Sequence, residues 1–306
     1  MTSDVRPRAA VVVGIDETPS AQRALSWAAG EAALRGLPLV VCNAYPNPGW
    51  PADAATEEAN QRQAWRLVRL GAETAREAVP GLDAVPYAAE GSVRRVLLDA
   101  VAEPALLVVG ARGRGSLAAL LLGSAGVDLA GRAPCPVAIV RETTQAGPHL
   151  FAGNVVVGVD GESSGAVVAV AFAEAALRGV SLVVVHAGIL GPVDAWRDEA
   201  FGEVHEERAP DGWEPLEAAV EPFRVRYPRV PVKLALRDGV PAANGLLSAA
   251  RGAAVLVVGS AGYGRVGGAL GRSISRAAVT RAPCPVIVVP TTAAVPTASA
   301  GKGEPR

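Results

Sequence analysis

Short apolar runs alternate with longer amphipathic stretches along almost the whole chain. Runs rich in Val and Leu, with the length and β-branching of buried strands, predict strands near residues 9–15, 38–44, 84–89, 105–110 and 136–141. Ala-rich stretches between them predict helices near 19–35, 56–78, 92–102 and 122–131. A second set of strands is predicted near 154–159, 181–187, 231–236, 254–259 and 285–289. Uninterrupted apolar strands separated by helices indicate a mainly parallel sheet covered on both faces and joined by right-handed crossovers.

The two sets of strands belong to an internal repeat of roughly 145 residues, which is too long for a solenoid unit and indicates a duplicated domain. The matching segments are Ala10–Asp16 with Val155–Asp160, Glu31–Gly36 with Glu174–Gly179, Leu107–Gly110 with Leu256–Gly259, and Arg132–Val137 with Arg281–Val286. We therefore predict two tandem doubly wound α/β domains, each with a five-stranded sheet, over residues 1–145 and 151–291. Residues 292–306 are rich in Thr, Ala, Pro and Gly with little to bury, which predicts a disordered tail.

Composition excludes several classes of partner. The 29 basic and 30 acidic residues give a net charge of −1, so there is no overall field to attract a nucleic acid or an anionic membrane. Lys233 and Lys302 are the only lysines, and neither lies in a P-loop motif. Three scattered cysteines fit neither a disulfide framework nor a metal site, which favours the cytoplasm. We expect no signal peptide and no membrane span.

Candidate chemistry follows the strand ends, because ligands of such sheets bind beyond the carboxyl ends of the strands, at the switch point in strand order. The fourth strand of the first half is followed by Gly110-Ala111-Arg112-Gly113, then nine residues, then Gly123-Ser124 at the start of a helix. Glycines let backbone N–H groups approach an anion closely, and a helix N-terminus adds donors and a favourable dipole. This spacing predicts a phosphate cradle.

These residues resemble the universal stress protein family, whose ATP-binding members carry G-x2-G-x9-G followed by Ser or Thr. Gly14-Ile15-Asp16 at the end of the first strand and Ala133-Pro134-Cys135-Pro136-Val137 before the last strand also look like family features. The resemblance covers both halves and implies an adenine nucleotide alpha-hydrolase-like fold that binds ATP, with Mg2+. It implies that Asp16 faces the ribose, the phosphates or Mg2+, and that Ala44 and Val109 lie against the adenine. It assigns the phosphates to Gly110, Gly113, Gly123, Ser124 and Ala125, and Gly14 and Arg112 complete the candidate set.

The second half departs from this pattern. Gly259-Ser260-Ala261-Gly262 is present, but the third glycine, Gly271, comes one position early and Arg272 precedes Ser273. An arginine there can pair with a phosphate or block it, so two outcomes stay open. The matching candidate residues of the second half are Gly158, Asp160, Ala187, Val258, Gly259, Gly262, Gly271 and Ser273.

Simpler interpretations exist for several of these residues. Asp16 and Asp160 could cap the helices that follow, and a glycine turn between strand and helix is often there for packing alone. His186 falls where the first half has Asn43, which favours packing or the edge of a pocket over catalysis. Cys135 and Cys284 lie between prolines and are interpreted as small buried apolar residues.

The sequence thus predicts an ATP-binding regulator of a stress response or of growth, whose two halves pack as an intrachain pseudo-dimer through their final strands. A homodimer of whole chains and an unidentified regulatory protein partner are also expected. Two alternatives stay open, namely a slow ATPase and an interaction scaffold that binds no nucleotide. Adenylating enzymes on similar sheets carry S-G-G-x-D-S or H-x-G-H motifs, and neither occurs in the sequence.

Overall fold

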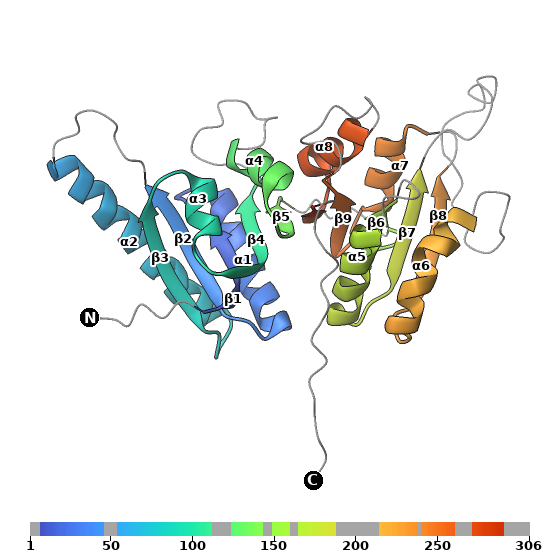
Figure 1. Cartoon of the computed structure of the whole chain (residues 1–306), viewed down its shortest axis with the longest axis horizontal. Coiled ribbons are helices and arrows are strands. Elements are labelled where there is room, and N and C mark those ends of the chain that lie inside the picture. The colour runs from blue at the N-terminus through green and yellow to red at the C-terminus, as the bar shows by residue number, and fades with distance from the viewer. Residues whose placement is uncertain are drawn as a thin grey trace, which may run out of the picture.

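The described residues contain ten strands that form one continuous sheet with helices on both faces (Figure 1). The computed structural model describes residues 7–45, 54–111, 124–142, 149–159, 165–187, 214–237, 240–260 and 271–290. The first half contains β1 (Ala9–Gly14), α1 (Pro19–Arg35), β2 (Leu39–Tyr45), α2 (Ala54–Ala78), β3 (Ala84–Glu90), α3 (Val93–Leu98), β4 (Glu103–Gly110), α4 (Ser124–Arg132) and β5 (Val137–Val140). The second half contains β6 (Val155–Gly158), α5 (Gly165–Arg178), β7 (Leu182–Ala187), α6 (Glu214–Arg226), β8 (Val232–Arg237), α7 (Ala242–Ala249), β9 (Val255–Gly259), α8 (Gly271–Arg281) and β10 (Val286–Val289).

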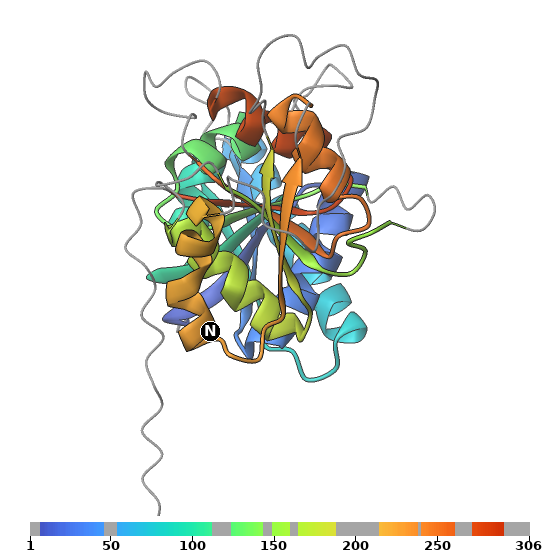
Figure 2. The ribbon, with the colours of Figure 1, turned by 90° about the vertical axis from the view of Figure 1, so that its right-hand side faces the viewer.

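The strand order is β3-β2-β1-β4-β5-β10-β9-β6-β7-β8, so the same doubly wound arrangement occurs twice. Neighbouring strands within each half are parallel, which confirms the predicted fold class. In both halves the order reverses beside the first strand, between β1 and β4 and between β6 and β9. Figure 2, which looks at the half that carries β8, shows the strands at the centre with helices around them.

The two halves meet at β5 and β10, which pair antiparallel with Val286 opposite Ile139 and Val288 opposite Val137. The predicted association of the halves through their final strands is therefore present within one chain. This pairing uses the inner edge of each five-stranded unit, and β3 and β8 form the outer edges of the sheet. A homodimer of whole chains, which stays a prediction, requires a surface other than the β5 and β10 edges.

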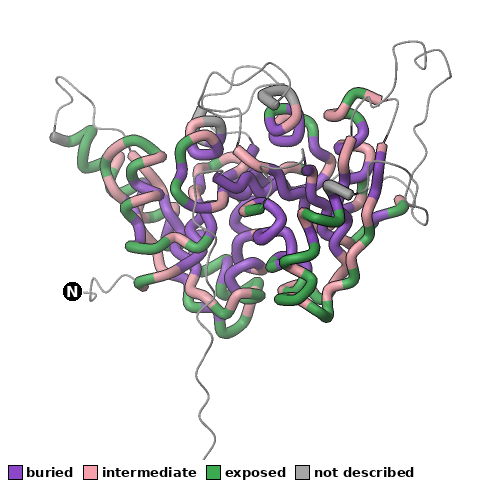
Figure 3. The backbone as a smooth tube through the Cα atoms, turned by 45° about the vertical axis from the view of Figure 1, so that its right-hand side comes forward, coloured by how far each residue is buried: buried purple, intermediate pink, exposed green. Residues whose placement is uncertain are grey.

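Alternating side chains of the strands supply two apolar layers. Val11 and Val13 of β1 pack on the face covered by α1, α2, α5 and α6, whereas Ala10 and Val12 pack on the face covered by α3, α4, α7 and α8. All four of these residues are fully buried. Figure 3 shows the same pattern for the whole chain, with buried strands at the centre and exposed residues on the outer sides of the helices.

Local signals define the helix that follows the first strand. Thr18 is its N-cap, Pro19 is its first residue, and Gly36 ends it in the left-handed conformation with φ of 61°. Only glycine adopts this φ without strain, and Gly179 ends α5 in the same way. The predicted helix over 92–102 is shorter in the structure, because Asp99 ends α3 and the chain enters β4 at Glu103.

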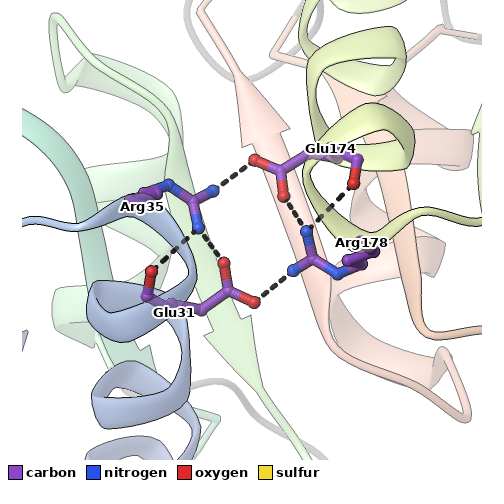
Figure 4. A network of polar contacts seen from close by, with 4 residues as sticks. All are labelled: Glu31, Arg35, Glu174 and Arg178. Atoms are coloured by element: carbon purple, nitrogen blue, oxygen red, sulfur yellow. Dashed lines mark hydrogen bonds and ion pairs between the residues drawn. The ribbon is translucent and has the colours of Figure 1, made fainter.

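A closed network of ion pairs joins α1 of the first half to α5 of the second half (Figure 4). Arg35 contacts Glu31 on its own helix and Glu174 on the other, and Arg178 contacts Glu174 on its own helix and Glu31 on the other. The two carboxylate side chains are only 4% and 7% exposed. Burial raises the pKa of Glu31, against the attraction of the two guanidinium groups, which lowers it.

Candidate functional site

The carboxyl ends of β1, β2 and β4 lie side by side and bring three of the predicted site segments together. Gly14 is opposite Cys42 of β2 on one side and opposite Val109 of β4 on the other. Ala44 lies two residues further along β2, and Gly110 ends β4. The switch point between β1 and β4 is therefore flanked by the residues that the resemblance assigns to adenine and ribose.

Asp16 is held by the first turn of the chain after β1. Its Oδ1 accepts a hydrogen bond from the backbone N–H of Thr18 at 2.9 Å and another from the Thr18 hydroxyl. Thr18 in turn accepts from the N–H of Ala21 at 3.3 Å and is the residue that caps α1. Asp16 is therefore not itself the N-cap of α1. It positions Thr18, which is the N-cap. The Asp16 side chain is half-buried at the carboxyl edge of the sheet.

Asn43 and His186 make equivalent hydrogen-bond contacts in the two halves. Asn43 Nδ2 donates to the carbonyl of Ile15 at 2.7 Å, and His186 Nδ1 lies 3.2 Å from the carbonyl of Val159. A carbonyl oxygen only accepts, so His186 Nδ1 carries the proton of this contact. Each side chain ties the second strand of its half to the residue before the predicted site aspartate, which supports a structural role.

Three of the predicted site glycines have a packing reason to be glycine. A Cβ on Gly110 would lie 2.6 Å from Ser20 Oγ and 2.8 Å from the Ser20 carbonyl carbon, because the first turn of α1 crosses the end of β4 closely. A Cβ on Gly14 would lie 3.2 Å from Leu97, and one on Gly158 would lie 2.7 Å from Leu246. The backbone of Ser20 cannot move without shifting α1, whereas the ends of the Leu97 and Leu246 side chains can shift, so packing explains the glycine most strongly at Gly110.

The other predicted site residues belong to the segments of the chain that follow β4, β6 and β9. Arg112, Gly113, Gly123, Asp160 and Gly262 lie outside the described residues. Ser124 is the first residue of α4 and Gly271 the first of α8, and Ala125 and Ser273 lie in the first turns of these helices.

In the second half, the described site residues occupy the same edge. Ala187 ends β7, and Gly259 ends β9 directly after Val258. Ser275 Oγ donates to the Gly259 carbonyl at 2.7 Å, so α8 is tied to the end of β9.

Cys135 and Cys284 are buried, as the sequence predicted, and Cys42 is buried as well. Burial raises the pKa of the Cys135 and Cys284 thiols to about 12, so neither is a nucleophile near neutral pH. Across the described part of the chain, the acidic, His and Cys residues form no group of three that could hold a metal ion. None of the described helices is long and apolar enough to span a membrane.

Sequence reasoning missed the Glu31, Arg35, Glu174 and Arg178 network, although the signal was in the repeat. Each half carries Glu and Arg four residues apart within an otherwise apolar Ala-rich stretch. A charged pair repeated in a buried helix indicates an interface between the copies, because an isolated buried charge is costly.

Fold and strand-end geometry together define a tandem, doubly wound α/β protein with a candidate ligand edge in each half. The model described as "Universal stress protein family" matches residues 8–141 and again residues 152–290. The chain therefore belongs to the universal stress protein family.

Similar proteins are also tandem or single members of this family. "Universal stress protein Rv1996" of Mycobacterium tuberculosis is 33% identical over 315 residues, covering 94% of this chain and 97% of that protein. The crystal structure of a universal stress protein from Archaeoglobus fulgidus superposes with a TM-score of 0.67 at 18% identity, covering 93% of this chain and 98% of that one. A universal stress protein solved in complex with cAMP is 27% identical, covers 44% of this chain and 97% of that one, and has a TM-score of 0.35.

Proposed function

We propose that the chain is an ATP-binding universal stress protein that acts as a nucleotide-dependent regulator of a stress response or of growth, with the first half as the competent site. One observation carries this proposal. The half-buried Asp16, the end of β2 at Ala44 and the buried Val109 surround the switch point, and the full G-x2-G-x9-G-S spacing follows directly after β4. That combination supports adenine and ribose at the strand ends and phosphates over the glycine loop.

Mg2+ fits the same edge in chemical terms. Mg2+ is usually held by one or two carboxylates together with phosphate oxygens and waters, and Asp16 is a carboxylate at the switch point whose position is fixed by Thr18. When bound, the ion would neutralise phosphate charge. The part of this chain is to orient the carboxylate and to present the first turn of α1 beneath the nucleotide.

A link between the site and the rest of the molecule supports a regulatory role. Helix α1 begins immediately after the Asp16 turn, and its last two turns carry Glu31 and Arg35, which pair with α5 of the second half. A ligand that shifts the start of α1 therefore acts on a rigid element whose other end lies at the contact between the halves. The proposed output is a change in the surface that the paired halves present to a protein partner.

The experiment is calorimetric titration of ATP with Mg2+ into the full chain, with released phosphate measured in parallel. Asp16→Asn and Gly113→Ala are expected to weaken saturable binding about tenfold or more, since they remove a charged ligand and obstruct backbone approach to phosphate. Asp83→Asn is the matched control, because Asp83 is an exposed carboxylate before β3, at the opposite edge of the sheet.

The outcomes separate the three candidate functions. Saturable binding with negligible turnover, lost in the site variants and retained in the control, supports the regulator. The same binding accompanied by steady phosphate release would make the chain an ATPase. Absence of binding in the folded chain would overturn the proposal and leave an interaction scaffold.

A further inference from the structure

The two halves differ in charge on the face covered by α3 and α4 in the first half and by α7 and α8 in the second. In the first half, the arginines of this surface are neutralised. Arg132 lies 3.5 Å from Asp128, Arg94 lies 3.8 Å from the same carboxylate, and Arg95 lies 3.3 Å from Asp99. Each cation therefore has an acidic neighbour.

The second half has no carboxylate at the positions of Asp99 and Asp128, nor at that of Glu103, which pairs with Arg8 in the first half. Counting from the matching runs Leu107–Gly110 and Leu256–Gly259, the residues Asp99, Glu103 and Asp128 correspond to Ser248, Gly252 and Ala277. Two arginines, Arg94 and Arg95, are also replaced, by Ala243 and Asn244. Arg132 is retained as Arg281, however, and Ala102 is replaced by Arg251. At these positions, the first half therefore carries arginines together with carboxylates, whereas the second half carries arginines and no carboxylates.

These cations line a cavity of about 480 Å³. Its polar lining consists of His149, Asn244, Ser248, Arg251 and Arg281, with no acidic residue among the described residues that line it. Within the described ranges, neither Arg251 nor Arg281 has a carboxylate within ion-pair distance. We refer to this as the amino-edge cavity.

The amino-edge cavity lies at the opposite edge of the sheet from the candidate nucleotide site. Arg251, Arg281 and His149 all come a few residues before the strands that follow them, β9, β10 and β6. Parallel strands place those starts together at the amino edge of the sheet. The cavity is consequently separate from Ala187 and Gly259, which lie at the carboxyl ends of β7 and β9.

The donors in the cavity suit an anion with several acceptor oxygens. Each guanidinium offers a planar pair of N–H groups, and the Asn244 amide adds further donors. Ser248 Oγ already accepts a hydrogen bond from Arg237 Nη2 at 3.1 Å, so its own proton is directed elsewhere and can be donated. The half-buried Leu247 supplies an apolar wall.

The electrostatic effects that oppose anion binding in the cavity are weaker than the attraction of the two guanidinium groups. The carboxyl ends of α7 and α8 also point toward the cavity, and a helix end carries only about half a unit of negative charge, whereas each guanidinium carries a full positive charge. A nucleic acid is a poor match, because binding a duplex typically uses about six to ten phosphate contacts and the cavity offers two arginines.

We propose that the amino-edge cavity binds a small phosphorylated anion, such as a phosphomonoester or a pyrophosphate group, through Arg251, Arg281 and Ser248. A dianionic tetrahedral group matches two guanidinium charges and uses the surrounding hydroxyl and amide donors. The second half thereby carries a ligand site that the first half has closed by its own carboxylates. This inference does not depend on nucleotide binding at the carboxyl edge.

The test is calorimetric titration of inorganic pyrophosphate into the full chain at constant ionic strength set with chloride. We expect saturable binding that Arg281→Ala weakens about tenfold or more, whereas Arg132→Ala, the same change at the matching position of the first half, leaves it unchanged. Ser248→Asp restores the first-half carboxylate and is expected to abolish binding through charge alone. Thermal unfolding of each variant verifies that it is folded.

Two further outcomes decide against the proposal. If Gly113→Ala weakens pyrophosphate binding and Arg281→Ala does not, the anion occupies the candidate nucleotide site instead. If no saturable binding occurs, or if Arg281→Ala and Arg132→Ala have equal effects, the cations form an ordinary solvated surface. Because Gly113→Ala tests only the carboxyl edge, failure of this inference and failure of the proposed ATP site give different results.

Discussion

The two halves share one fold but fill the space between their first two helices differently. In the second half, Phe172 of α5 stacks with Phe223 of α6 at a ring distance of 5.7 Å, and with Tyr227 just beyond α6 at 5.8 Å. In the first half, Ala29 stands at the position of Phe172, judged from the matching Glu31 and Glu174. The same architecture therefore accepts an aromatic stack or small residues at one site.

The first half has a groove of about 920 Å³ between α1 and α2, lined on its apolar side by Leu25, Leu67 and Leu70. Counting back from the matching prolines Pro80 and Pro228, the positions of the two α6-side rings are Ala75 and Val79 in the first half. Ala29 and Ala75 are buried in the core, so small side chains cover the sheet in the first half where aromatic rings cover it in the second. The comparison teaches that one sheet accepts either small residues or an aromatic stack beneath its helices.

The largest effect is expected for Phe172→Ala, which places the first-half residue into the second half. Phe172 is fully buried, so the change should lower the free energy of unfolding by about 3–5 kcal/mol. Denaturant unfolding measures it, with Val225→Ala on α6 as control, because Val225 is 80% exposed and should shift the free energy by less than about 0.5 kcal/mol. Equal effects of the two changes would mean that the stack does not stabilise the second half.

The second-largest loss of stability is expected from a change in the buried ion-pair network, to which each half contributes one Glu and one Arg. Glu174→Gln removes one carboxylate from the buried network and leaves Arg35 and Arg178 without full compensation, which should cost about 3 kcal/mol. Glu58→Gln is the matched control, because Glu58 pairs with Arg62 in an exposed contact worth about 0–1 kcal/mol. Urea titration at neutral pH compares them, and a Glu174→Gln cost no larger than the control would show that the network does not hold the halves together.

A smaller effect is expected for Gly110→Ala. The added methyl group meets the backbone of Ser20, which cannot move without shifting α1, so we expect a loss of about 1–3 kcal/mol. Gly165→Ala at the start of α5 has nothing within 4 Å of the new carbon and serves as control. Thermal unfolding without nucleotide measures this loss. If the Gly110→Ala protein were as stable as the unchanged protein, packing against Ser20 would not explain the glycine, and ligand binding would be left as its explanation.

The order and type of the elements followed from the sequence because buried parallel strands and Ala-rich helices have distinct lengths and compositions. The predicted helix over 19–35 coincides with α1, since Pro19 and Gly36 mark both of its ends. The groove, the aromatic stack and the amino-edge cavity were not predictable in this way. They depend on which side chains from distant elements come together, as Arg251 and Arg281 do around the amino-edge cavity and Phe172 and Phe223 do in the stack.

The candidate site was only partly predictable for a related reason. The family resemblance singled out Asp16, Ala44 and Val109, and the structure places all three at or beside the ends of neighbouring strands, where the switch-point rule expects a ligand. The resemblance did not reveal that Gly14 and Gly110 face Leu97 and Ser20, since a glycine required by a neighbouring helix and one required by a phosphate are identical in sequence.

The smallest effect is a gain in stability from Gly30→Ala, which gives the first half the residue that the second half already has. Gly30 lies inside α1, and Ala173 occupies the matching position of α5. A new Cβ has nothing within 4 Å, so the substitution keeps the packing and removes the entropic cost of glycine in a helix. The free energy of unfolding should rise by about 0.5–1 kcal/mol. Denaturant unfolding of this variant is compared with that of Ala173→Gly, whose free energy of unfolding should fall by a similar amount. A lower free energy of unfolding for Gly30→Ala would show that glycine is required where α1 approaches α5.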